Sequence, residues 1–174
     1  MNLATQLHRS ALLYGDAIAA RCDDEVRTFA ELEERSNRLA NALLARGLKH
    51  GERVATWMEN SIRCVELDFA LAKAGLVRVS LNPRLTAQEA QYILQDSDAR
   101  CLVWGASFDA QIAQATQHAP TLMLRLRAGE GSAPIEAGVH DAVLLLYGQL
   151  AVFTREEAAA LLRLAAHSLR PGGR

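Results

Sequence analysis

Histidines are the side chains of this sequence that are best suited to metal binding or proton transfer. The chain carries five of them, at His8, His50, His118, His140 and His167. None lies three or four residues from another histidine or from a cysteine, the spacing that would place two strong ligands on one face of a helix. We therefore predict no metal site and interpret the histidines as residues of the surface or of linkers.

Three cysteines, Cys22, Cys64 and Cys101, are the candidate thiol nucleophiles. They are odd in number and far apart, so they form neither a C-x-x-C metal pair nor a disulfide framework. Cys64 falls within an expected helix and Cys101 at the start of an expected strand, where cysteine usually packs as a small hydrophobic residue. We predict no catalytic cysteine, and a reducing, cytoplasmic location.

Two glycine-containing phrases are partial matches to known site motifs. Residues 129–131, Gly-Glu-Gly, begin the pattern of a dinucleotide-binding loop, but Pro134 stands where the third glycine is needed. Residues 105–107, Gly-Ala-Ser followed by Asp109, lack the G-x-S-x-G spacing of a nucleophile elbow. We interpret the first phrase as a plain loop and Ser107 as a helix cap.

Trp57 and Trp104 both stand at the ends of expected strands. They could line the mouth of a pocket, but packing in the core is the commoner role of such aromatic side chains. The sequence therefore assigns no catalytic, cofactor-binding or metal-binding residue.

The elements that position these residues centre on residues 53–81. Residues 53–58 and 76–81 predict two strands, and the segment between them predicts a helix that is capped by Asn60 and Ser61 and ends at Gly75. The expected buried face of this helix is formed by Ile62, Val65, Phe69, Leu71 and Ala72. Two strands joined by one helix are most simply parallel, with a right-handed crossover.

Upstream of this unit, residues 2–14 predict a short docking helix through Leu3, Leu7, Leu12 and Leu13. Residues 17–28 predict a hairpin that turns at Asp23 and Asp24. Thr28 and Glu31 then form a capping box for a helix whose expected apolar stripe is Leu32, Leu39, Ala40, Leu43 and Leu44. Its solvated face is expected to pair Glu31 with Arg35 and Glu34 with Arg38.

Downstream, Thr86 and Glu89 repeat the capping-box spacing ahead of a helix to about Gln95. Residues 100–104 and 122–126 predict strands, and residues 107–117 a helix between them. The alternation predicts an α/β fold with a doubly wound, mostly parallel sheet, flanking helices and a short N-terminal hairpin.

The composition is that of an ordinary globular protein, with 50% hydrophobic and 22% charged residues and a formal net charge of -1. Because acids and bases are interspersed, there is no basic patch for nucleic acid or for an anionic membrane surface. We therefore expect neither as a partner, and no stretch approaches the length of a membrane-spanning helix.

Residues 3–126 resemble the N-terminal part of the AMP-forming acyl-CoA synthetases, the adenylate-forming ligases. The resemblance rests on TFAELEERSNRLANALLARGLKHGERVATWMENS from Thr28 and FALAKAGLVRVSLNPRLTAQEAQYILQDSDARCLV from Phe69. It implies a two-step reaction in which a carboxylate attacks ATP to give an acyl-adenylate, and coenzyme A then displaces AMP. ATP, Mg²⁺ and coenzyme A would be the family's cofactors and substrates.

The last part of the chain, HDAVLLLYGQLAVFTREEAAALLRLAAHSLRPGGR from His140, is similar to a segment of class I methyltransferases that use S-adenosylmethionine. We therefore predict a synthetase-like part at 1–127, a linker or fusion seam at 128–139 and a methyltransferase-like strand and helix at 140–174. The glycine-rich loop that would bind S-adenosylmethionine is absent from the sequence.

The sequence also lacks the T-S-G-T-T-G-x-P-K-G phosphate loop of the synthetases, which would stabilise the charge that develops on ATP. We therefore predict an incomplete ligase that binds no cofactor and does not catalyse alone. Two alternatives are a binding module that pairs with a complementing chain or a second copy through an exposed sheet edge, and a methyltransferase fragment.

Overall fold

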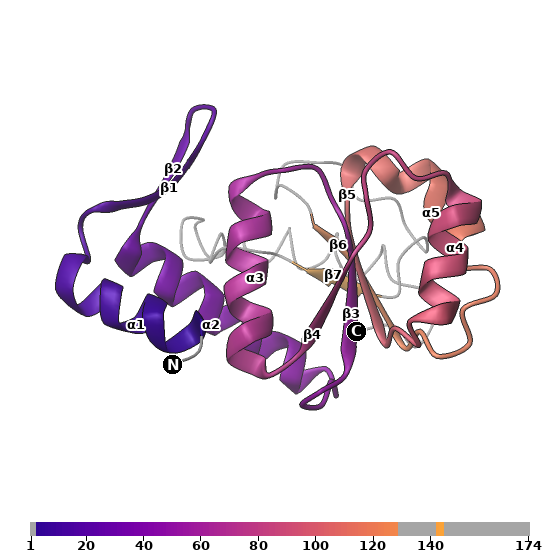
Figure 1. Ribbon diagram of the computed structural model, residues 1–174, viewed down its shortest axis with the longest axis horizontal. Helices are drawn as coiled ribbons and strands as arrows, with labels where there is room; N and C mark the ends of the chain where they lie inside the picture. The colour runs from indigo at the N-terminus through magenta and orange to yellow at the C-terminus, as the bar shows by residue number, and fades with distance from the viewer. Residues whose placement is uncertain (1–2, 129–141, 145–174) are drawn as a thin grey trace, which may run out of the picture. The chain divides into compact units, whose positions relative to one another are not determined.

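The computed structural model describes residues 3–128 and 142–144 (Figure 1). Outside these residues lie the predicted linker beyond Ala128, the Gly-Glu-Gly phrase at 129–131, His140, His167 and most of the predicted methyltransferase-like segment. In chain order the elements are α1 (Leu3–Tyr14), β1 (Ile18–Cys22), β2 (Glu25–Thr28), α2 (Phe29–Ala45), β3 (Arg53–Trp57), α3 (Ile62–Ala74), β4 (Val77–Ser80), α4 (Ala87–Asp96), β5 (Cys101–Gly105), the 3₁₀ turn η1 (Ala106–Phe108), α5 (Asp109–Ala115), β6 (Leu124–Ala128) and β7 (Ala142–Leu144).

The strands form a sheet of order β4-β3-β5-β6-β7 and a separate hairpin of β1 and β2. Strand β5 pairs with β6 in parallel, with Trp104 opposite Arg127, and β6 pairs with β7 in parallel. The Val77 N–H donates to the Glu52 carbonyl and the Leu81 N–H to the Thr56 carbonyl, each at 2.9 Å. Because both partners advance in the same direction, β3 and β4 are parallel. The predicted α/β fold with flanking helices and an N-terminal hairpin is confirmed.

The contacts divide the chain into two compact units. Unit 1 comprises Met1–Val54 and Glu59–Arg78, and unit 2 comprises Ala55–Met58 and Val79–Arg174.

In unit 1, α2 begins at the predicted capping box. The Thr28 hydroxyl accepts from the Glu31 N–H at 3.2 Å, and the Glu31 carboxylate accepts from the Thr28 N–H at 2.9 Å. These bonds satisfy N–H groups that the first turn of a helix leaves without partners.

The buried face of helix α3 matches the prediction in part: Ile62 and Leu71 are buried as expected. Val65, Phe69 and Ala72 are only partly buried. The residues that are fully covered are Ile62, Glu66, Leu67, Ala70, Leu71 and Ala74. Counting apolar residues misplaced part of the face because a carboxylate, Glu66, lies at its centre. The predicted caps were half right: Ser61 occupies the N-cap position without a side-chain bond, whereas Gly75 ends the helix with a φ of 67°.

The prediction that α1 docks through four leucines is wrong for most of them. Only Leu7 is buried, whereas Leu3, Leu12 and Leu13 are exposed. Leu44 of α2, expected in the apolar stripe, is also exposed, and Ser36 is buried in its stead. The Ser36 hydroxyl donates to the Leu32 carbonyl at 2.7 Å, which allows a polar side chain to be buried there.

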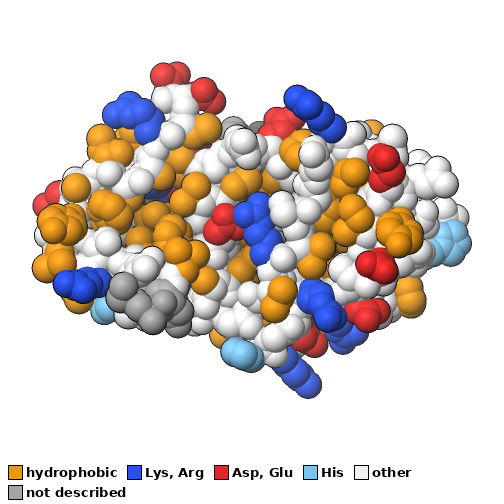
Figure 2. Space-filling view, in the orientation of Figure 1, with side chains coloured by type: hydrophobic (Ala, Val, Ile, Leu, Met, Phe, Trp, Pro, Cys, Tyr) orange, Lys and Arg blue, Asp and Glu red, His pale blue; other side chains and the backbone are white. Residues whose placement is uncertain are grey.

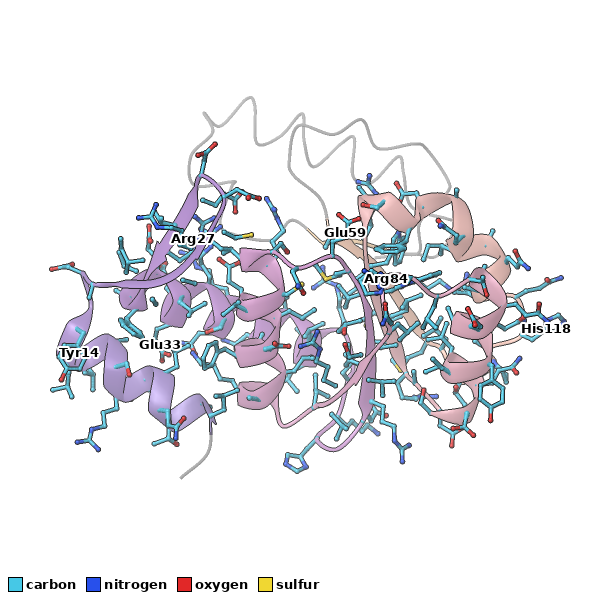
Figure 3. The ribbon with its side chains drawn as sticks, turned by 45° about the horizontal axis from the view of Figure 1, so that its top comes forward. Tyr14, Arg27, Glu33, Glu59, Arg84 and His118 are labelled. Carbon is cyan, nitrogen blue, oxygen red and sulfur yellow. The ribbon has the colours of Figure 1, made fainter. Side chains whose placement is uncertain are left out.

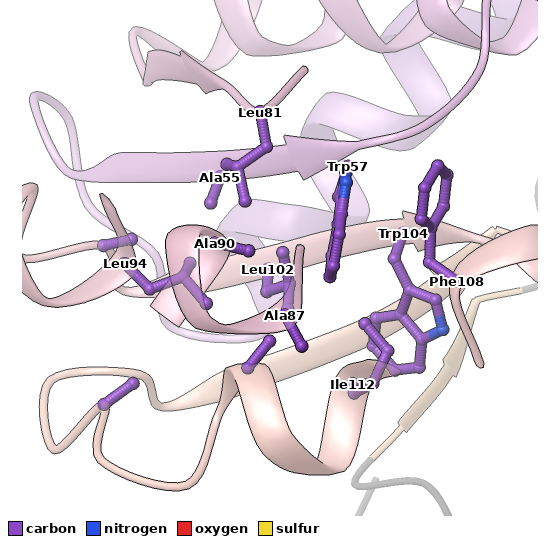
Figure 4. Close-up of a cluster of buried hydrophobic side chains, with 13 residues drawn as sticks. Ala55, Trp57, Leu81, Ala87, Ala90, Leu94, Leu102, Trp104, Phe108 and Ile112 are labelled. Carbon is purple, nitrogen blue, oxygen red and sulfur yellow. The ribbon is translucent and has the colours of Figure 1, made fainter. Parts of the chain in front are cut away.

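The core of unit 2 is a cluster of buried side chains between β3, β5, α4 and α5 (Figure 4). Helix α4 begins at the predicted capping box of Thr86 and Glu89. Ser107 does not cap a helix: it lies within η1, and the N-cap position of α5 belongs to Phe108. Strand β6 starts and ends two residues later than predicted, at Leu124 and Ala128, and therefore includes Arg127. Among the described residues no helix is long and apolar enough to cross a membrane.

Candidate functional site

The candidate site of unit 2 is the carboxyl edge of its parallel strands, because open α/β sheets bind ligands at that edge. Strands β3, β5 and β6 end there at Trp57, Gly105 and Ala128. The polar groups at this edge are the Trp104 indole, the carboxylate of Asp109 at the start of α5 and the guanidinium of Arg127. The parallel register of β5 and β6 brings Trp104 and Arg127 side by side.

The carboxylate of Asp109 is engaged by both neighbours. Its Oδ1 accepts from the Trp104 Nε1–H at 2.8 Å, and Arg127 Nε lies 2.9 Å from each carboxylate oxygen. The Arg127 side chain is only 14% exposed, so the pair is shielded from water on one side. Both oxygens of this carboxylate are thus engaged by side chains of the neighbouring strands. We interpret this trio as a brace that fixes the start of α5 to the sheet.

Buried aromatic rings pack beneath the carboxyl ends of the same strands. The rings of Trp57 and Phe108 stack with centroids 4.8 Å apart and an interplanar angle of 24°. Trp57 and Trp104 are 0% and 2% exposed, which confirms the prediction that they pack in the core. The Trp57 Nε1–H is buried without a hydrogen-bond partner among the described residues.

A shallow depression of about 640 Å³ lies at the start of α4. It is lined by Leu85, Thr86, Gln88, Glu89, Tyr92 and Ile93. Hydrogen bonds from the backbone and hydroxyl of Thr86 lower the pKa of Glu89, which is thereby committed to capping the helix. The surface of the depression is mainly apolar.

The most deeply buried charge of unit 1 is Glu66 on α3. Its side chain is 0% exposed, and its Oε1 accepts from Arg27 Nε at 3.1 Å and from Arg35 Nε at 2.9 Å (Figure 3 labels Arg27). Its Oε2 has no partner among the described residues. Burial raises the pKa of Glu66 to about 7, although the charges of Arg35 and Arg27 oppose the shift. Arg35, which was predicted to pair with Glu31, thus binds a carboxylate of another helix. The predicted pair of Arg38 and Glu34 forms, at 2.6 Å.

A second polar cluster joins the three helices of unit 1 at Glu33, which Figure 3 labels. Lys73 of α3 donates to Glu33 Oε2 at 2.6 Å and to Asn37 Oδ1 at 2.8 Å, and His8 of α1 lies 3.0 Å from Glu33 Oε1. Burial alone would raise the pKa of Glu33, but bonds from Lys73, His8 and Asn37 outweigh it and lower the pKa. The cluster fastens α1 and α3 to α2.

The histidines and cysteines that the structure describes lie in different elements and loops. His50 is exposed, and exposed His118 contacts the Gln91 amide of α4 at 2.8 Å. Cys101 is buried as predicted, whereas Cys64 is only partly buried and its thiol donates to the Glu59 carbonyl at 3.0 Å. Within residues 3–128 and 142–144, no group of three or more His, Cys, Asp or Glu side chains could hold a metal ion.

Comparison with protein families gives a match to the AMP-binding enzymes over residues 7–159. This match runs through the predicted seam at 128–139 and into the segment predicted to resemble methyltransferases. The boundaries of the three predicted parts stay a prediction, and the comparisons do not show the methyltransferase-like segment.

Among curated proteins, the chain is 35% identical over 133 residues to the long-chain-fatty-acid–CoA ligase FadD13 of Mycobacterium tuberculosis, covering 69% of this chain and 26% of the relative. It is 30% identical over 132 residues to a medium/long-chain-fatty-acid/3-oxocholest-4-en-26-oate–CoA ligase of Mycobacterium marinum, covering 76% of this chain and 24% of the relative. The chain thus spans about a quarter of the length of these relatives.

Solved structures agree with this placement. A benzoate CoA ligase from Burkholderia xenovorans matches with a TM-score of 0.68 at 26% identity, over 74% of this chain and 26% of that one. The inhibitor-bound N-terminal domain of FACL13 from Mycobacterium tuberculosis matches with a TM-score of 0.69 at 27% identity, over 98% of this chain and 37% of that one.

Proposed function

Because this chain belongs to the family of AMP-binding enzymes, we propose that it forms the N-terminal α/β part of an ATP-dependent ligase that joins a carboxylic acid to coenzyme A. In the complete enzyme the carboxylate would attack ATP to give an acyl-adenylate and pyrophosphate, and the thiol of coenzyme A would displace AMP. The observation that carries this proposal is the family match, which includes both units of the described fold.

The substrate class follows from the relatives. Their names specify fatty acids, a steroid carboxylate and benzoate, so the shared chemistry is an apolar body with one carboxylate. We propose a fatty or aromatic acid as the substrate and the cytoplasm as the location, because widely spaced free cysteines suit a reducing compartment.

We further propose that the 174-residue chain does not catalyse alone. Its sequence contains no Ser/Thr/Gly-rich phosphate loop, and the carboxylate at the strand edge, Asp109, is committed to Arg127 and Trp104. ATP, Mg²⁺ and coenzyme A would be held by parts of the enzyme that this chain does not supply. A complementing chain could add those parts by pairing with an outer strand of the sheet, β4 or β7, whose outer edges have no neighbour among the described strands.

The test is isothermal titration of the purified chain with ATP–Mg²⁺ and, separately, with S-adenosylmethionine. We expect no saturable heat with either compound, because the sequence contains neither the phosphate loop of the synthetases nor the glycine-rich loop of the methyltransferases. A full-length ligase such as FadD13 serves as the positive control for ATP. Saturable ATP binding would contradict the proposal of an incomplete site, and binding of S-adenosylmethionine would favour the methyltransferase alternative.

A further inference from the structure

The surface at the end of α1 carries four exposed apolar side chains. Leu12 is 74% exposed, Tyr14 61%, Leu13 58% and Ile18 54%. Figure 2 shows hydrophobic side chains gathering over α1 and the base of the hairpin, at the left of the view. Single exposed apolar residues are ordinary, but a contiguous group of this kind marks an interaction surface. We call these four residues the α1 patch.

Two opposite charges flank the α1 patch at matched distances along the chain. Arg9 stands three residues before Leu12, and Asp16 stands three residues after Leu13. Both side chains are exposed, and neither makes a hydrogen bond or ion pair within residues 3–128. Such free charges beside an apolar patch resemble the polar rim of a protein interface.

We propose that the α1 patch is a self-complementary interface through which two copies of this chain form a weak dimer. The ends of α1 from the two copies would cross antiparallel about a two-fold axis, with Leu12 of one copy against Leu13 of the other. The same register places Arg9 of each copy beside Asp16 of its partner, so that one symmetry operation satisfies both the apolar contact and the two charge pairs.

This charge arrangement favours a second copy over an unrelated partner. An interface with two-fold symmetry requires that the surface be complementary to itself, and opposite charges placed evenly about an apolar centre meet that requirement. A different partner would place no such condition on Arg9 and Asp16. The patch is small, so we expect a transient dimer of the class that buries less than about 1,200 Å² in total.

Sedimentation velocity of the purified chain from about 5 to about 500 µM at low salt tests the proposal, because small interfaces dissociate in this range. We expect the weight-average sedimentation coefficient to rise with concentration. The double variant Leu12→Glu/Leu13→Glu should weaken association at least about tenfold, because it places four like charges at the centre of the interface. Tyr92→Glu changes an equally exposed aromatic residue on α4 and should associate as the parent does.

Reversal of the charges at Arg9 and Asp16 tests whether these two residues pair across the dimer interface. Arg9→Glu or Asp16→Lys alone should weaken association about threefold or more, and the double variant Arg9→Glu/Asp16→Lys should restore it, because the pair is re-formed with its signs exchanged. Far-UV circular dichroism checks that each variant is folded. A chain that stays monomeric throughout, or a dimer that Leu12→Glu/Leu13→Glu leaves intact, would overturn the proposal. Failure of the double charge variant to restore association would overturn the register.

Discussion

Trp57→Ala is expected to lower the free energy of unfolding by about 3–5 kcal/mol, the usual cost of deleting a fully buried aromatic side chain. Trp57 is 0% exposed, stacks on Phe108 and packs within the cluster that joins β3, α4 and η1. A domain of this size has only about 5–15 kcal/mol of stability in all. The variant should therefore unfold at much lower urea concentration than the parent, as followed by far-UV circular dichroism.

Trp57→Phe distinguishes loss of packing from loss of the indole N–H. It keeps a ring against Phe108 and removes a donor that has no partner among the described residues. We expect it to cost less than about 2 kcal/mol, since most of the apolar surface is retained. Tyr92→Ala on exposed α4 is the matched aromatic control and should change stability by about 0.5 kcal/mol or less. A loss for Trp57→Phe as large as that for Trp57→Ala would show that the N–H has a partner after all.

The second large effect is a pH dependence of stability that originates at Glu66. Burial raises the pKa of this carboxyl from 4.5 to about 7 in the folded chain, so the folded state binds more protons than the unfolded state between these values. Its contribution to stability is fully present below about pH 4.5 and is lost as the pH rises through about 7. The loss is about 3 kcal/mol, which is the free energy equivalent of the shift.

Glu66→Gln isolates this contribution because it keeps the shape of the side chain and removes its titration. The stability of the parent relative to Glu66→Gln, measured by urea unfolding, should fall by about 3 kcal/mol between about pH 4.5 and pH 8. Glu34→Gln removes a carboxyl that is 61% exposed on α2, and its difference from the parent should not fall in this way. If the difference in stability between the parent and Glu66→Gln does not change with pH, Arg27 and Arg35 fully offset the cost of burying the charge.

Much of the fold could be predicted because its signals are local. The capping boxes of Thr28 with Glu31 and of Thr86 with Glu89 form with both of their hydrogen bonds, and Gly75 takes the positive φ expected of a helix end. These features depend on residues within one helical turn of each other. The order of strands and helices followed for the same reason, since periodicity is a property of short segments.

Side-chain partners could not be predicted from such signals. Arg35 stands four residues from Glu31, which suggested a surface pair, yet it binds Glu66 of another helix. Hydrophobic periodicity cannot indicate a buried carboxylate, because it counts Glu66 as a solvent-facing residue. The exposure of Leu12 and Leu13 was missed because hydrophobic periodicity counts every apolar side chain as buried.

The candidate site was the hardest part to predict. The brace of Trp104, Asp109 and Arg127 depends on the parallel register of β5 and β6, which joins residues far apart in sequence. The predicted strand ended at Leu126, so Arg127 was placed outside the sheet. The dipeptide Arg-Ala at 127–128 completes strand β6, and its basic residue is a signal that could have suggested a partner for Asp109.

Exchange of pyrophosphate into ATP by a chimeric ligase tests whether this chain is the N-terminal part of such an enzyme. In this chimera, residues 3–128 of this chain replace the matching part of the Mycobacterium tuberculosis ligase FadD13. We expect the chimera to catalyse exchange that depends on a fatty acid, and the 174-residue chain alone to give none under the same conditions. A folded chimera without exchange, or exchange by the chain alone, would contradict the claim that this chain is the N-terminal part of such a ligase and is inactive by itself.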